Sequence, residues 1–215
     1  MRYQPLSNLL VGLASQAPLV LLPLFTTDAI AGAWALCTRL LSAVVVAGQA
    51  VLQSVYYSEA AAHVREGRWG QLRRWHVRWT IGLGAGAGLL FVIAGWVIAN
   101  LLPRLDPQWA SVGSVVIAGC IFWGSLLWSV PLSQTLQLVH AMGWQFAWAV
   151  VRFVVAGGGF VATSWLGGAT AVWTWAVLCF LTDALLVVVQ LLILARRSRD
   201  SALSADMEWS RAENV

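Results

Sequence analysis

Charged side chains are scarce in this sequence, and lysine is missing altogether. Only 10% of the 215 residues are charged, and all 13 basic residues are arginine. Soluble domains are usually about 25% charged. The hydrophobic fraction is 60% and the mean hydropathy is +0.75, so the chain is an integral membrane protein. Its net charge of +4 does not indicate nucleic-acid binding, because the arginines lie beside apolar segments, as membrane topology requires.

Cysteine is also rare, and its spacing excludes the common metal sites. Cys37, Cys120 and Cys179 lie far apart inside apolar segments, which argues against a disulfide framework and a zinc site. Phosphate-binding loops and paired carboxylates are missing as well. The histidines are expected at the cytoplasmic edge rather than beside a buried nucleophile; they are His63, His76 and His140. We therefore expect no enzymatic activity, no metal and no cofactor.

Six apolar segments are each long enough to cross a bilayer, which takes about 20 residues. They cover residues 6–27, 29–57, 80–102, 109–135, 144–166 and 169–195. The pattern predicts an all-α bundle of six transmembrane helices within residues 1–197. The polar tail, residues 198–215, is expected to be disordered. In the third span Gly84 and Gly88 have the spacing that lets two helix backbones approach closely.

A basic segment, residues 58–78, separates the second and third spans. Trp69, Leu72, Trp75 and, just after the segment, Trp79 form an apolar edge along it, which predicts an amphipathic helix lying in the membrane interface. Anionic headgroups would attract each of its arginines by about 1 kcal/mol. These arginines are Arg65, Arg68, Arg73, Arg74 and Arg78. We interpret the segment as a topology anchor; a specific partner site is the alternative.

Arginine placement also predicts the orientation of the chain. With six spans, Arg2, the cluster in residues 65–78 and the cluster in residues 196–199 fall on one side of the membrane. The other side carries only Arg104. The positive-inside rule then places both termini in the cytoplasm.

Polar side chains form a stripe within the second span. Arg39, Ser42, Gln49 and Gln53 share one helix face, and Asn8 is a comparable polar position in the first span. An arginine at bilayer depth costs about 2.5 kcal/mol or more, so we expect Arg39 to face other helices or water. Packing between helices and a solute pathway are both open interpretations.

Two further charges lie deep in the fifth and sixth spans. At 1.5 Å per residue, Arg152 lies about 12 Å and Asp183 about 18 Å from the cytoplasmic ends of their spans. A tight turn joins these spans, so the two side chains are expected to pair, in either a structural or a functional role. One acid cannot neutralise both Arg39 and Arg152. The remaining buried positive charge would suit an anionic solute such as a phosphate or pyrophosphate.

Three stretches resemble a known family. They are YQPLSNLLVGLASQAPLVLL and AGAWALCTRLLSAVVVAGQAVLQSVYYSEAAAHVREG, within residues 3–67, and VPLSQTLQLVHAMG, within residues 129–145. They resemble the C-terminal half of bacterial oligosaccharide flippases, members of the multidrug/oligosaccharidyl-lipid/polysaccharide exporter superfamily. In particular, Arg39 matches that family's recurring helix arginine.

The resemblance implies a flippase for polysaccharide or lipopolysaccharide biosynthesis in the bacterial cytoplasmic (inner) membrane. Such a protein moves a polyprenyl-pyrophosphate-linked glycan to the outer leaflet by alternating access through a cationic cavity. The chain departs from the family in two ways. It has six predicted spans rather than twelve or fourteen, and Trp144 and Gln145 stand where the family tends to have a basic residue after the turn glycine.

The leading hypothesis is therefore a half-transporter for a lipid-linked glycan. It would be a truncated product, a split half with a separate partner, or a homodimer that rebuilds two lobes. Asp183 would orient Arg152 or carry a coupling proton. The predicted substrate-binding residues are Arg39, Arg152, Gln49, Gln53, Asn8 and Ser42. The alternatives are a multidrug or metabolite exporter of the same superfamily and a non-transporting membrane scaffold for glycan assembly.

Overall fold

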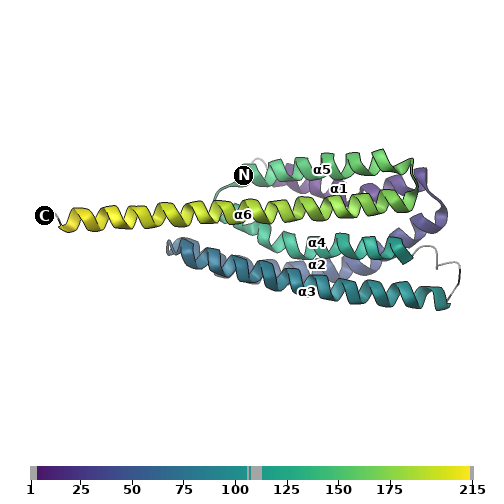
Figure 1. Cartoon of the computed structure of the whole chain (residues 1–215), viewed down its shortest axis with the longest axis horizontal. Helices are drawn as coiled ribbons and strands as arrows, with labels where there is room; N and C mark the ends of the chain where they lie inside the picture. Colours follow the sequence, from purple (N-terminus) through teal and green to yellow (C-terminus); the bar gives the residue numbers. More distant parts are fainter. Residues whose placement is uncertain (1–3, 106, 108–112, 214–215) are drawn as a thin grey trace.

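Six long helices make up nearly all of the computed structural model, which describes residues 4–105, 107 and 113–213 (Figure 1). They are α1 (Gln4–Phe25), α2 (Asp28–Arg65), α3 (Trp69–Leu105), α4 (Gly113–Leu138), α5 (Met142–Ser164) and α6 (Gly168–Glu213). The described residues contain no strand, so the all-α fold class is confirmed. Helices α2 to α6 are long and apolar enough to span a membrane, and α1 adds the shorter apolar stretch Leu9–Phe25. The chain is a multi-pass membrane protein, and the count of six spans stays a prediction.

Helix α4 is the centre of the bundle. It packs against α2, α3 and α6, while α5 packs mainly against α6 and α1. Within its most apolar 18-residue window, 72% of α4 is buried, compared with 17% for α3. Small residues allow this close packing. At Gly119, for example, an added Cβ would lie 2.4 Å from the Sγ of Cys37 on α2.

An aromatic cluster fills the core beside Gly119. Trp34 on α2 meets Trp175 on α6 edge to face, with ring centroids 5.3 Å apart. Phe122 on α4 packs against Trp175 at 4.1 Å and against Trp34 at 6.1 Å. All three side chains are fully or almost fully buried, so this cluster fixes α2, α4 and α6 relative to one another.

The predicted interfacial helix does not exist as a separate element, and that prediction is wrong. Residues 58–65 continue α2, and α3 begins at Trp69 after a turn in which Gly67 has a φ of +66°. A positive φ at this position is typical of the glycine that ends a helix. The apolar edge is used inside the protein: the rings of Trp75 and Trp79 lie 4.6 Å and 5.6 Å from that of Tyr56 on α2.

The predicted disordered tail is also wrong, because α6 continues as a helix to Glu213. No glycine or proline follows Gly168, so nothing in the sequence ends the helix near residue 198. Figure 1 shows α6 extending well beyond the other helices. It also shows that α1 begins at the end of the bundle that holds the α2–α3 turn, and that α6 leaves the bundle at the same end.

Candidate functional site

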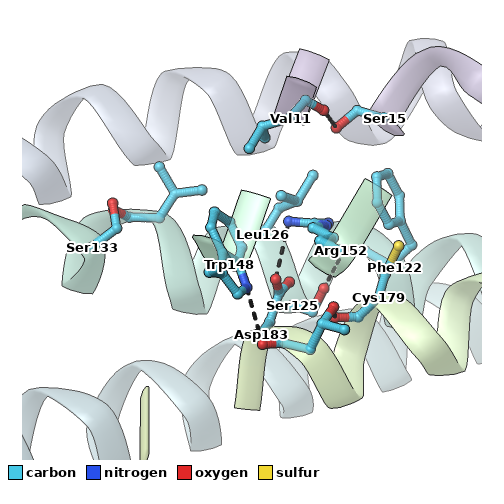
Figure 2. A network of polar contacts seen from close by, with 12 residues as sticks. Val11, Ser15, Phe122, Ser125, Leu126, Ser133, Trp148, Arg152, Cys179 and Asp183 are labelled. Atoms are coloured by element: carbon cyan, nitrogen blue, oxygen red, sulfur yellow. Dashed lines mark hydrogen bonds and ion pairs between the residues drawn. The ribbon is translucent and has the colours of Figure 1, made fainter. Parts of the chain in front are cut away.

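The predicted pairing of Arg152 with Asp183 is confirmed. The Nη1 atom of Arg152 on α5 lies 3.0 Å from the Oδ1 atom of Asp183 on α6, and both side chains are completely buried. Figure 2 shows the guanidinium pointing at the carboxylate in the space between α4, α5 and α6. Burying two opposite charges together is far less costly than burying either one alone.

The groups around this pair are aromatic rings and serine hydroxyls. The Arg152 guanidinium lies 5.4 Å from the ring centre of Trp148 and 5.7 Å from that of Phe122, within the range of cation–π attraction. Ser125 and Ser129 on α4 lie next to the carboxylate of Asp183. In the described part of the structure, Arg152 Nε and Nη2 and Asp183 Oδ2 have no hydrogen-bond partner. The pair therefore keeps unused hydrogen-bonding capacity.

A second polar layer lies two helical turns away from the ion pair. Gln145 is seven residues before Arg152 on α5, and Gln190 is seven residues after Asp183 on α6. Helices α5 and α6 are antiparallel, so the register that pairs Arg152 with Asp183 also puts the two glutamines at one level. That level lies about 10 Å along the helix axes from the ion pair. Both are buried, and among the described residues neither Gln145 Oε1 nor the Gln190 amide has a partner. The spacing of seven is the sequence signal for this layer.

A third polar cluster joins α2, α3 and α4. Nδ1 of His76 lies 2.5 Å from the hydroxyl of Tyr56 and 3.2 Å from that of Thr135, and the two hydroxyls also contact each other. All three side chains are buried. The sequence predicts His76 only at the cytoplasmic edge and does not reveal that its ring links three helices.

Replacing Tyr56 with phenylalanine should lower the free energy of unfolding by about 1–2 kcal/mol, because it leaves buried polar atoms of His76 and Thr135 short of a partner. Thermal unfolding of the purified protein in detergent would measure the loss. Tyr57→Phe is the matched control, since Tyr57 is 47% exposed. Equal unfolding temperatures for the two variants would contradict a structural role for this cluster.

From the sequence we expect Arg39 to be a surplus positive charge buried with Arg152 and Asp183. That expectation is wrong, because Arg39 does not share an interior space with them. The Arg39 side chain is exposed on the surface of the bundle. The physical reason is the rotation of α2: Trp34, Cys37 and Leu41 supply the face that packs in the core. The polar stripe therefore lies beside this contact face instead of within it. Among the residues that the structure describes, the buried arginine and carboxylate are Arg152 and Asp183, so the core holds no surplus positive charge.

The other residues of the stripe lie at the margin of the α2–α4 contact. Gln49 and Gln53 are half-buried, and Gln49 Nε2 donates a 2.9 Å hydrogen bond to the carbonyl of Leu126 on α4. Ser42 is half-buried and its hydroxyl lies 3.5 Å from the carbonyl oxygen of Arg39. The side chain of Asn8 lies outside the described residues.

The arginines of the basic segment gather at the α2–α3 end of the bundle. All five are exposed, and Arg68 pairs with Glu66. The five are Arg65, Arg68, Arg73, Arg74 and Arg78. This position agrees with contact to a membrane surface, which stays a prediction.

No protein-family model, no curated protein and no solved structure matches this chain. The functional interpretation is therefore based on the sequence resemblance and on the geometry of the charged residues.

Proposed function

We propose that this chain is one half of a transporter that flips a lipid-linked oligosaccharide, or a related anionic lipid-linked glycan, by alternating access in the bacterial cytoplasmic membrane. The observation that carries the proposal is the exposure of Arg39 within a membrane-spanning helix. Arg39 lies eleven residues from the start of α2, which is about 16 Å along the helix axis.

Hydrocarbon cannot cover such a side chain at low cost, because an arginine at the centre of a bilayer costs at least about 2.5 kcal/mol. The face of α2 that carries Arg39 therefore needs water or protein beside it. A guanidinium can bind a phosphate or pyrophosphate through two parallel hydrogen bonds, which makes Arg39 suitable for the headgroup of a polyprenyl-linked sugar.

A second six-helix half would supply the missing wall of the cavity. That half is either a separate chain or a second copy of this one, in which case a two-fold axis would bring two copies of Arg39 to one cavity. Gln53 and Ser42 are half-buried on the same side of α2, and in this scheme they would bond sugar hydroxyls. In this scheme the buried Arg152–Asp183 pair holds α5 against α6, and Asp183 is the candidate carrier of a coupling proton.

Replacing Arg39 with alanine should abolish glycan transport while leaving membrane expression intact, because the headgroup loses its charged ligand. The measurement is restoration of surface polysaccharide in a strain that lacks the gene, with its partner half supplied where one is needed. Leu40→Ala, which changes the adjacent exposed residue, is the control and should transport normally. Normal polysaccharide with Arg39→Ala would remove Arg39 from the mechanism and with it the main support for this function.

A non-transporting scaffold for glycan assembly is the second candidate, and one observation favours it. Such a scaffold predicts buried charges that are mutually paired, as Arg152 and Asp183 are. Arg39 is the exception. Loss of glycan assembly on gene deletion, together with full function of Arg39→Ala, would favour the scaffold. The related drug exporter has less support, because Asp183 is fully buried and so not accessible to a cationic drug.

A further inference from the structure

An apolar groove of about 570 Å³ runs along the contact between α3 and α4. The glycine pair expected to bring helices together has two different environments here. At Gly84 an added Cβ would lie 3.2 Å from Nε1 of Trp128, whereas at Gly88 it would meet nothing within 4 Å. The two helices are close again at Gly95, where an added Cβ would lie 3.1 Å from Sγ of Cys120. The helices therefore touch on either side of Gly88 and leave a groove there.

The chemistry of the groove excludes a polar ligand. Its lining consists of glycines and apolar or aromatic side chains, with Asn100 and Ser125 as the polar exceptions. Both α3 and α4 are long and apolar enough to span a membrane, so the groove lies at the depth of the lipid chains. Its occupant must therefore be a hydrocarbon.

The width of the groove distinguishes a lipid chain from a helix. From Gly84 to Asn100 the axis of α3 rises about 24 Å. Spread over that length, 570 Å³ corresponds to a mean cross-section of about 24 Å². A helix with its side chains is about 10 Å across, or roughly 80 Å² in section, so it would lie over the groove rather than within it. Carbon atoms in contact lie about 4 Å apart, so one extended chain needs roughly 16 Å² and does fit.

The two ends of the groove differ, and this sets the direction of the lipid. At one end Trp128 stacks on Phe180 with ring centroids 6.0 Å apart and donates a 3.0 Å hydrogen bond to the carbonyl of Thr80. At the other end Asn100 is exposed, and Arg104, also exposed, lies one helical turn beyond it. A chain that lies in the groove with its headgroup beside Asn100 would leave the lipid phosphate within reach of the Arg104 guanidinium.

We propose that the α3–α4 groove binds one hydrocarbon chain of a phosphate-bearing membrane lipid, taken from the leaflet at the Arg104 end. This site is separate from Arg39 and does not require the transport function. A bound chain would fill the space around Gly88 and stabilise the contact between α3 and the central helix α4.

Native mass spectrometry of the full-length protein, purified in mild detergent with added phosphatidylglycerol, tests the proposal. Gly88→Leu puts a side chain into the groove, and Gly86→Leu is the matched control, because its Cβ also meets nothing within 4 Å and Gly86 does not line the groove. We expect lipid retained by the native protein and by Gly86→Leu, and an apparent affinity weakened by about tenfold or more in Gly88→Leu. Equal retention in the two variants would overturn the proposal.

A second measurement keeps the test valid if Gly88→Leu folds poorly. A phospholipid with a photoreactive group midway along one chain should crosslink to residues 84–96 and 117–128 of the native protein. Arg104→Gln should weaken retention of phosphatidylglycerol without moving these crosslinks. Crosslinks spread evenly over the outer faces of α1 and α5 would show a surrounding lipid shell only, and the proposal would fail.

Discussion

Asp183→Leu is expected to destabilise this protein more than any other single change considered above, by about 3–5 kcal/mol. The substitution leaves the Arg152 guanidinium fully buried without its acidic partner. The nearby rings of Trp148 and Phe122 attract the cation but do not replace a carboxylate, since cation–π attraction in a desolvated site is worth only about 2 kcal/mol or somewhat more. The loss would appear as a large fall in the unfolding temperature in detergent and in the yield of monodisperse protein.

The double variant Arg152→Met/Asp183→Leu separates the lost ion pair from simple loss of packing. Replacing both charges with apolar side chains of similar size removes the unpaired cation, so the double variant should recover most of the stability lost in Asp183→Leu. A double variant no more stable than the single one would show that packing, rather than the unpaired buried charge, determines the effect. If Asp183→Leu alone unfolds at the native temperature, the pair contributes no structural support.

Gly119→Val is expected to cost about 3 kcal/mol, because it overfills a very close contact in the core. An added Cβ at Gly119 would lie 2.4 Å from Cys37 Sγ and 3.5 Å from the ring of Trp34. Trp34 packs on Trp175 and Phe122, so the strain cannot be relieved without disturbing the junction of α2, α4 and α6. Chemical or thermal unfolding in detergent would measure the change.

The smaller substitution Gly119→Ala allows this contact to be tested directly. Cys37→Ala removes the sulfur that the new methyl group meets, so the two substitutions together should cost less than the sum of their separate effects. Gly86→Ala is the control for helix propensity, because its Cβ points into open space and alanine favours a helix by up to about 1 kcal/mol. Strict additivity between Gly119→Ala and Cys37→Ala would contradict the contact.

The buried ion pair could be predicted from the sequence because only local geometry was needed. The short α5–α6 turn and a fixed rise per residue place Arg152 and Asp183 within about 6 Å of the same level, which an arginine side chain can span. The rotation of α2 could not be predicted in the same way. The stripe with Arg39 and the stripe with Trp34 are neighbours on one helix, and packing against α4 determines which of them is buried.

Contacts between distant segments also explain the other errors. Trp75 has the spacing of a membrane-surface residue, yet it packs on Tyr56 when α2 and α3 form a continuous hairpin. His76 lies close to the charged segment in sequence, and only the fold brings Thr135 next to its ring. The groove at Gly88 was equally hidden, because a glycine spacing does not show whether the neighbouring helix touches at both positions.

The enclosed charge pair has a consequence for how the chain is made. During synthesis, α5 on its own would present a bare cation to lipid, and α6 on its own a bare anion, each with an insertion cost of about 3 kcal/mol. Gly167, with a φ of +125°, forms the sharp turn that lets the two segments fold back on each other. We therefore expect α5 and α6 to leave the translocon as a preformed hairpin, already neutral, rather than one after the other.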